Sequence, residues 1–321
     1  GGGSGAIVVS SIIKGIKSFR ENLYIFGGNR TDVLLQINSP TQISVQQVTE
    51  NVGCVDGHTI QEIGGDLIWL SPDGFRTIAG TQRIDDVEIG SLSSAIQPLI
   101  NTIVAAKNTY TFSSLVIRSK NQYRFFYINS AGVGHGIIGT LRPNPQGGEG
   151  YEWSEMRDIN VYSAASDFDD NGVEVYYHGD TAGNVRVHDS GDSFAGSNIS
   201  AEFKSPDTHF GDLGMRKTLH YIHASISRTA VLALSLQVRF DFSSTLVTQP
   251  GTFAIASPVA PSTYGTAIYG TSTYGSSGEP LIRVPLQGSG HSASMKFFSN
   301  DQNPSYTIHG YHLEVMGSGR M

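Results

Sequence analysis

The first stretch with residues suited to chemistry spans positions 167 to 172, Asp-Phe-Asp-Asp-Asn-Gly. The first, third, fifth and sixth positions of a calcium-binding EF-hand loop are matched by Asp167, Asp169, Asn171 and Gly172. The twelfth position of such a loop is a bidentate Glu, whereas this chain has His178. A strand-like run follows instead of a helix, and Asn-Gly is the preferred pair for a type I′ hairpin turn, which needs positive φ at both central residues. We therefore predict a hairpin turn that binds no metal.

A second pattern, Gly134-His-Gly136-Ile-Ile-Gly139, has the G-x-G-x-x-G spacing of dinucleotide-binding loops. Such a loop needs a helix directly after the glycines, because the N-terminus of that helix binds the pyrophosphate. The residues that follow are Leu141-Arg-Pro143-Asn-Pro145, which are unsuited to beginning that helix. We predict no nucleotide site and no cofactor.

Ser71-Pro-Asp73-Gly74 approaches the S-x-D-x-G-x-x-W turn of sialidase-type propellers. Its glycine comes one place early and no Trp follows, so an ordinary turn is the preferred interpretation. The chain also has no G-x-S-x-G sequence, so nothing supports the nucleophile of an α/β-hydrolase.

The histidines and carboxylates offer no clear constellation. His220 and His223 are three residues apart, as are His309 and His312, and an odd spacing on a strand places side chains on opposite faces. A glycosidase pair needs two facing carboxylates. Candidates for it are Asp85, Asp86, Glu88, Glu152, Glu155, Asp158 and Asp167. The sequence does not tell which of these face each other, so we assign no catalytic, cofactor-binding or metal-binding residue and expect no enzyme.

Composition narrows the class of protein further. The chain has 321 residues, 38 of them glycine, and only 15% are charged, which suits strands joined by many tight turns. The net charge is −7 and no Lys/Arg cluster occurs, so the electrostatic footprint of a nucleic-acid-binding protein is missing. The single cysteine, Cys54, rules out an internal disulfide and is expected to be a small buried apolar residue. No apolar run reaches the length of about 18 residues that a membrane span needs.

The elements that position these residues repeat along the chain. A polar turn followed by an aromatic or apolar strand recurs roughly every 45 to 55 residues, the spacing of a four-stranded propeller blade. The copies are Phe19–Phe26, Ile63–Leu70, Ser119–Ile128 and Gly172–Tyr177. We therefore predict an all-β chain with a β-propeller-like domain of antiparallel blades over residues 16–205. Tyr24, Ile68, Phe126 and Tyr176 are expected on inner or middle strands of the blades.

Two further regions complete the prediction. Apolar residues at helical spacing between Ser91 and Lys107 predict one short inserted helix, although Pro98 lies inside the pattern. From residue 206 to 321 the long strand-like segments predict a β-sandwich-like region. It includes a loop with the tandem repeat Ser262-Thr-Tyr-Gly265 and Ser272-Thr-Tyr-Gly275. Residues 1–15, which begin Gly-Gly-Gly-Ser-Gly, are expected to be a flexible lead-in or a truncated start.

Several of these segments together resemble a known family. They are Val52–His58, Ile63–Ile78, Gly191–Phe203 and the sequence Phe-Gly-Asp-Leu-Gly-Met-Arg-Lys at 210–217. The short strand, the Ser-x-Asp-Gly turn and the following Phe-Arg are similar to the blades of β-propeller proteins in bacteriophage tails. The likeness is greatest to the tail nozzle or hub of short-tailed phages and covers most of residues 16 to 226.

The resemblance implies a structural virion protein located in the phage tail. Such proteins form a homo-oligomeric ring, commonly a hexamer, around the genome exit channel, next to adaptor and fibre proteins. DNA would pass through the ring without specific binding, which agrees with an acidic chain. The alternative is a carbohydrate-binding or carbohydrate-cleaving propeller that acts on the host surface, because 14 Tyr and 15 Phe residues offer aromatic faces to sugars.

Overall fold

A computed structural model describes residues 7–39, 41–79, 91–143, 149–228, 232–257, 281–302 and 305–320. The chain divides into two compact units, Gly1–Asp189 and Ser190–Met321, and each is described by itself. Over the described ranges the structure consists mostly of small antiparallel β-sheets, with the single α-helix α2, so the all-β prediction is confirmed. None of these sheets closes on itself, and a propeller or sandwich arrangement stays a prediction.

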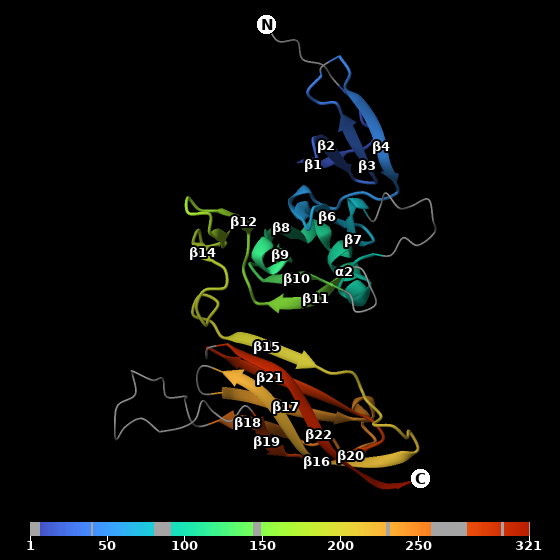
Figure 1. The fold of residues 1–321 in the computed structure, drawn as a ribbon, viewed down its shortest axis with the longest axis vertical. Coiled ribbons are helices and arrows are strands. Elements are labelled where there is room, and N and C mark those ends of the chain that lie inside the picture. Colours follow the sequence, from blue (N-terminus) through green and yellow to red (C-terminus); the bar gives the residue numbers. More distant parts are fainter. Residues whose placement is uncertain are drawn as a thin grey trace, which may run out of the picture. The chain divides into compact units, whose positions relative to one another are not determined.

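The first unit contains four sheets, each built from strands that follow one another along the chain (Figure 1). The first sheet comprises β1 (Ile13–Phe19), β2 (Asn22–Gly27), β3 (Arg30–Leu35) and β4 (Ser44–Glu50). The second comprises β5 (Gln61–Ile63), β6 (Asp66–Ser71) and β7 (Gly74–Thr77). The third comprises β8 (Tyr110–Ile117), β9 (Gln122–Asn129), β10 (Gly134–Pro143) and β11 (Glu149–Arg157). The fourth comprises β12 (Ser163–Phe168), β13 (Glu174–Gly179) and β14 (Val185–Val187).

The four residues that the repeated module places on inner or middle strands lie on β2, β6, β9 and β13, which have a partner strand on both sides. They are Tyr24, Ile68, Phe126 and Tyr176. This part of the prediction is confirmed. Short 3-10 turns connect some of the strands: η1 (Gly57–Thr59), η2 (Ser94–Ile96), η3 (Lys107–Thr109) and η4 (Arg118–Lys120).

Successive sheets of the first unit share hydrophobic cores. Phe26 of the first sheet and Trp69 of the second are fully buried with ring centroids 5.0 Å apart, and the Trp69 indole N–H donates to the Gly53 carbonyl at 3.1 Å. Phe75 of the second sheet and Phe125 of the third meet edge to face at 5.4 Å. The first three sheets therefore pack on one another through apolar faces, and burial of such large aromatic side chains is the main stabilising contribution.

The predicted helix is confirmed as α2 (Gln97–Ala105), which follows η2 directly. Pro98 lies in its first turn, where a missing backbone N–H costs no hydrogen bond, so the proline is compatible with the helix. Ile100 and Ile103, three residues apart, are buried in the core that the second and third sheets share.

The predicted hairpin at Asp167–Gly172 is confirmed, since β12 and β13 pair on either side of the turn, but Asp167 and Phe168 belong to β12 and the turn begins only at Asp169. The turn type differs from the prediction. A type I′ turn needs positive φ at both Asn171 and Gly172, but only Gly172 has one, at +76°. The Asp169 carboxylate accepts hydrogen bonds from the backbone N–H groups of Asn171 and Val173, at 2.9 and 2.8 Å. A capped three-residue loop with glycine in the left-handed region results.

The same loop occurs at two further hairpins of this unit. Asp180 accepts from Ala182 and Asn184 through one carboxylate oxygen, and Gly183 has a φ of +83°. Asn129 accepts from Ala131 and Val133 in the same way, and Gly132 has a φ of +80°. The segment that resembles a calcium-binding loop therefore contains one copy of a repeated turn of the form Asp/Asn-x-x-Gly-x.

The second unit contains two sheets around one core. One sheet has the order β15 (Ile199–Lys204), β21 (Ala293–Asp301), β17 (Leu232–Phe240), β18 (Thr252–Ser257). In the other, β16 (Met215–Arg228) pairs with β22 (Tyr306–Arg320) along one edge and with β19 (Leu281–Pro285) and β20 (Ser289–Gly290) along the opposite edge. A short 3-10 turn, η5 (Asp241–Ser243), follows β17. The tandem Ser-Thr-Tyr-Gly repeat lies outside the described residues.

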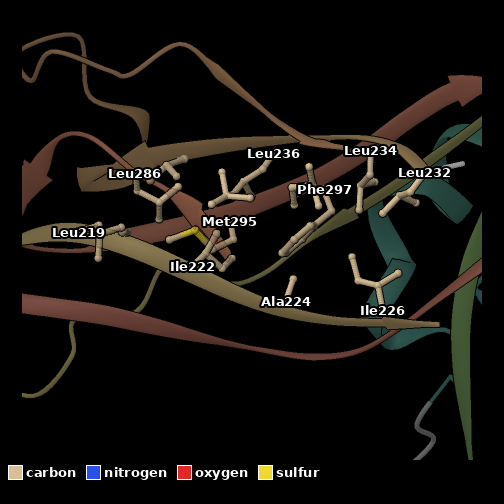
Figure 2. Close-up of a cluster of buried hydrophobic side chains, with 14 of the residues drawn as sticks. Leu219, Ile222, Ala224, Ile226, Leu232, Leu234, Leu236, Leu286, Met295 and Phe297 are labelled. Atoms are coloured by element: carbon tan, nitrogen blue, oxygen red, sulfur yellow. The ribbon is translucent and has the colours of Figure 1, made fainter. Parts of the chain in front are cut away.

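Side chains from both sheets point toward one another in this core, as Figure 2 shows for Leu219, Ile222 and Ile226 of β16 and Leu236 and Phe297 of the other sheet. Strand β17 alternates strictly, with every second side chain buried from Leu232 to Phe240. This alternation is the sequence signal of a strand that buries one face.

Candidate functional site

Two unpaired strand edges bound a groove in the second unit. Within the described ranges β15 pairs only with β21, and β22 pairs only with β16, so the outer edge of each strand has no partner strand. The groove, here called the edge groove, encloses about 590 Å³ between these edges. It is lined by Gly191, Asp192, Ile199, Ala201, Glu202, Phe203, Phe297, Ser299, Asp301, Ser305, Tyr306, Ile308, His309, Gly310 and Tyr311.

Aromatic and aliphatic side chains form the floor of the edge groove. Phe297 is buried, and its ring lies 5.4 Å from that of Tyr311 and 6.2 Å from that of Phe203. Tyr306, Ile308 and Tyr311 pack against the core but stay only partly buried. Phe203 is 53% exposed, although it is the cross-strand partner of Phe297. Partly exposed aromatic and aliphatic side chains at the margin of the core therefore lie between β15 and β22, and exposed apolar surface of this kind marks interaction sites.

A second hollow of about 400 Å³ adjoins the first along β22, and Tyr311 lines both. Met295, Leu313 and Val315 line it on the core side, and Phe210 lines it from the segment after β15. The opening thus follows β22 over most of its length. This shape suits an extended chain better than a compact ligand.

The carboxylates of the edge groove have no lysine or arginine beside them in its lining. Asp192, Glu202 and Asp301 line it, and none of its lining residues is Lys or Arg. Glu202 forms an ion pair with Lys296 at 2.8 Å. Such a groove favours a ligand that is apolar along its length and carries positive charge at its ends.

Two hydroxyl contacts fix side chains at the end of the edge groove where β22 begins. The Tyr306 hydroxyl and Ser299 Oγ are 3.0 Å apart, and His309 Nε2 is 2.7 Å from Ser227 Oγ. These bonds hold a tyrosine and a histidine that sequence analysis did not connect, because Ser227 and His309 come from different strands.

The four histidines of the predicted pairs lie on β16 and β22. The register shifts of these strands fall at His220 and His309, so bulges there interrupt the alternation on which the odd-spacing argument depended. His223 and His312 are cross-strand partners instead, with ring centroids 6.2 Å apart. In the described part of the chain, no group of three or more His, Cys, Asp or Glu residues is arranged to hold a metal ion.

Glu314 completes a polar cluster beside these histidines. Its Oε1 lies 2.6 Å from His223 Nε2 and 3.9 Å from the Arg283 guanidinium, which stacks over the Tyr221 ring. The hydrogen bond from His223 is the main cause that lowers the pKa of Glu314. The cluster ties β19, β16 and β22 together across the sheet.

A second polar cluster lies between the third and fourth sheets of the first unit. The Arg124 guanidinium is nearly fully buried and donates two hydrogen bonds to Asp189, at 2.8 and 2.7 Å, and Lys120 also pairs with Asp189. Burial acts to raise the pKa of Asp189, but the hydrogen bonds from Arg124 and Lys120 outweigh it and lower the pKa to about 2. This carboxylate is a structural counter-ion for the buried arginine.

Two buried imidazoles lie beside this ion pair. The rings of His178 and His188 have centroids 4.5 Å apart, and His188 stacks on Phe126 at 5.4 Å. Burial lowers the pKa of His188 to about 3, with the charge of Arg124 as a further cause, and burial also lowers the pKa of His178. Both side chains are therefore neutral at physiological pH, and they join the two sheets by packing.

The glycine pattern at 134–139 lies within strand β10, which pairs with β9 and β11. A Cβ on Gly139 would lie 2.6 Å from the Trp153 ring, and one on Gly136 would lie 2.7 Å from Met156. The neighbouring strand β11 supplies both side chains. Close packing of large side chains therefore explains these two glycines.

The turn at Ser71–Gly74 connects β6 and β7, as predicted, and Asp73 there pairs with Arg76. Cys54 is 1% exposed, its Sγ lies 3.1 Å from the Asp56 carbonyl, and burial raises its pKa to about 12. The thiol is therefore protonated and inert, which agrees with the predicted buried apolar role.

The carboxylates considered for a glycosidase pair have separate partners or lie outside the described residues. Glu152 pairs with Arg142 at 2.8 Å, and Glu155 pairs with Arg157 at 2.9 Å. The Asp167 carboxylate accepts a hydrogen bond from the backbone N–H of Phe168 at 2.9 Å. Asp158 lies at a bend after β11, where its backbone has a positive φ of 59°. Asp85, Asp86 and Glu88 lie outside the described residues.

Comparison with known proteins gives no relative for this chain: no protein-family model matches it, and no curated protein sequence is similar to it. None of the described helices is long and apolar enough to cross a membrane.

Proposed function

We propose that the chain is a structural subunit of a short-tailed phage tail, where copies of it form a ring, commonly of six, around the genome exit channel. The ring would contact adaptor and fibre proteins and let DNA pass without specific binding. The observation that carries this proposal is the apolar surface of the edge groove, because partly exposed apolar side chains between unpaired strand edges mark an assembly contact.

The first unit supplies the second support. Four meanders follow one another along the chain and the first three share hydrophobic cores, an organisation that propeller blades also use. Packed sheets of this kind make a stiff subunit, and a ring needs stiff subunits because small angular errors prevent closure. The segments at 52–58, 63–78 and 210–217 resemble phage tail proteins, and this resemblance is the reason for proposing a phage tail as the assembly.

The proposal is tested by the mass of the assembly. The full chain, studied by native mass spectrometry and sedimentation velocity at micromolar concentration, is expected to form a closed oligomer of one defined size. Permanent assemblies of this type bury well over about 1,000 Å² per interface, so dilution should not dissociate it readily. A chain that stays monomeric at all concentrations would contradict a ring.

A second candidate function is binding or cleavage of a host-surface carbohydrate, and the composition of the edge groove favours it. Phe203, Tyr306 and Tyr311 offer aromatic faces to sugar rings, and Asp192 and Asp301 offer carboxylates for sugar hydroxyls. A glycan array followed by an assay for reducing ends would detect this activity. A bound or shortened polysaccharide would favour this candidate over the ring.

A further inference from the structure

We propose that the edge groove receives the segment 7–13 of a second copy of this chain, which adds a β-strand beside β15 or β22. This inference rests on the proposed function, because it specifies the contact by which copies would form the ring. The mode is β-strand addition, in which backbone hydrogen bonds supply affinity and side-chain pockets supply specificity.

The groove has the features that such a strand requires. The outer edges of β15 and β22 present backbone N–H and C=O groups without a strand partner in the described residues. Between the edges, the partly buried Ile308 and Tyr311 and the half-exposed Phe203 present apolar surface that an inserted strand would cover. An unpaired edge that flanks exposed apolar surface is unfavourable for an isolated subunit, and a docked strand removes both problems.

The segment 7–13 has the complementary features. Its sequence is Ile-Val-Val-Ser-Ser-Ile-Ile, which is rich in β-branched residues with high β-propensity. Four of its large aliphatic side chains are exposed: Ile7 by 45%, Val8 by 88%, Ile12 by 79% and Ile13 by 51%. Residues 7–12 belong to no strand, and Ile13 begins β1, which is an edge strand. Ser11 and Ile12 bind Gly28 and Asn29 of their own copy on one side, so the opposite side of the segment would face the second copy. Contiguous exposed aliphatic side chains of this kind indicate a surface that another molecule covers.

Length and charge agree with this pairing. Seven extended residues span about 23 Å, enough to run along the whole of β15, which has 6 residues. Between residues 7 and 19 the only charged residues are Lys14 and Lys17. Lys14 directly follows the uncharged segment, and the edge groove is lined by Asp192, Glu202 and Asp301 and by no Lys or Arg, although Glu202 already pairs with Lys296. Charge therefore does not oppose the contact.

The contact is heterologous, because the segment and the groove are different surfaces of the same chain. Each copy would insert its segment into the next copy and receive a segment from the previous one. Heterologous contacts generate a ring when the rotation closes, whereas a symmetric dimer needs one surface that contacts itself. The proposed contact is therefore of the type that a closed ring requires.

Mixed disulfide trapping tests the contact directly. Full-length Val8→Cys and full-length Phe203→Cys are mixed, dissociated, reassembled and oxidised, and a covalent dimer of one copy of each is expected. Each variant alone should give no covalent dimer, and the native Cys54 is buried. Leu281→Cys is the matched control for Phe203→Cys, because Leu281 is also half exposed but lies on β19, at the opposite edge of β16 from β22.

A substitution without new cysteines gives the second readout. Val8→Asp places a charge on an 88% exposed side chain and is expected to raise the protein concentration needed for assembly at least tenfold. Val173→Asp, on a 58% exposed side chain in a hairpin loop, is the control and should leave assembly unchanged. If assemblies form but Val8→Asp does not weaken them and no mixed dimer is trapped, this inference is wrong while the ring survives. If the unmodified chain never assembles, both proposals are wrong.

Discussion

At the residue scale, the imidazoles of His178 and His188 are the groups whose protonation the fold opposes. His188 faces Phe126, the His178 ring and the Arg124–Asp189 ion pair, with Lys120 beside it. His178 lies near Asp180 and Arg186, which pair with each other. A proton on either ring would be buried beside cationic guanidinium groups, and it would push the third and fourth sheets apart.

These two histidines predict a loss of stability on acidification. The pKa of His188 falls from 6.5 in the unfolded chain to about 3 in the folded chain, so between these pH values only the unfolded chain binds the proton. Stability is therefore complete above pH 6.5 and decreases as the pH falls toward 3. We expect the free energy of unfolding of the first unit to drop by about 3 kcal/mol from pH 7 to pH 4, since one pKa unit corresponds to about 1.4 kcal/mol, measured by urea unfolding.

Two variants separate this effect from general acid denaturation. His188→Gln should remove most of the slope of stability against pH, whereas His58→Gln should keep it, because the His58 side chain is 80% exposed. The Asp189 pair stays ionised in this range, since the pKa of Asp189 is about 2. Equal slopes for His188→Gln and the unmodified chain would contradict the assignment.

Single residues also show what the sequence alone reveals. The burial of Cys54 and the strand position of Tyr24 were predictable, because small thiols and aromatic strand residues are usually buried. The His178–His188 pair was not, since its members come from β13 and the residue after β14 and meet only when the fourth sheet packs on the third. The Arg124–Asp189 pair joins residues 65 positions apart, and no local pattern signals it.

At the element scale, the repeated turn Asp/Asn-x-x-Gly-x forms three hairpins of the first unit, β9–β10, β12–β13 and β13–β14. Each copy uses a side-chain oxygen to hold two backbone N–H groups and a glycine to reach positive φ. The hairpins were predictable from these residue types. The turn type was not, because Asn-Gly favours type I′ locally, while the Asp169 cap stabilises the longer loop that is formed.

The turn predicts a specific cost for replacing its glycine. A Cβ on Gly172 or Gly183 would meet nothing within 4 Å, so Gly172→Ala and Gly183→Ala test backbone strain alone. Each is expected to lower the free energy of unfolding by about 1 kcal/mol, the penalty of the left-handed region for alanine. Gly251→Ala is the control, because its Cβ is equally free and its φ is not positive. A stability change at Gly183 no larger than at Gly251 would refute the argument.

The same turn predicts indifference to calcium. One Asp169 oxygen already accepts two backbone hydrogen bonds, and the bond to Val173 is the main cause that lowers the pKa of this carboxyl. We expect the melting temperature to be the same in millimolar calcium and in excess chelator, by differential scanning calorimetry. A chelator-dependent loss of several kcal/mol would instead indicate a metal site that contributes to folding.

Longer elements were predictable in position but not in pairing. The strands β17, β21 and β22 follow the apolar patterns of the sequence, since burial of one face requires them. The bulges at His220 and His309 and the pairing of β15 with β21, about 100 residues later, depend on contacts far apart in the chain. The edge groove arises from that pairing, and for this reason no motif reveals it.

At the scale of the whole molecule, charge relates the chain to its proposed role. The net charge is −7, and the edge groove itself contains three acidic residues and no Lys or Arg. A conduit for DNA gains nothing from phosphate contacts, because each Lys or Arg that binds a phosphate retards passage and must be released again. A ring of acidic subunits repels the polyanion from its walls and keeps it mobile.

This argument predicts how DNA responds to added positive charge. The purified assembly should not retard duplex DNA in a mobility-shift assay at about 0.1 M salt, because it has no basic cluster to release counterions. Lysine substitutions at the acidic residues that face the channel should create salt-sensitive binding and slow genome ejection, while the mass of the assembly stays unchanged. Lysine substitutions at acidic residues on the outer surface are the matched control and should leave ejection normal. Strong DNA binding by the unmodified assembly, weakening steeply with salt, would mean that the protein grips DNA and is not a passive channel.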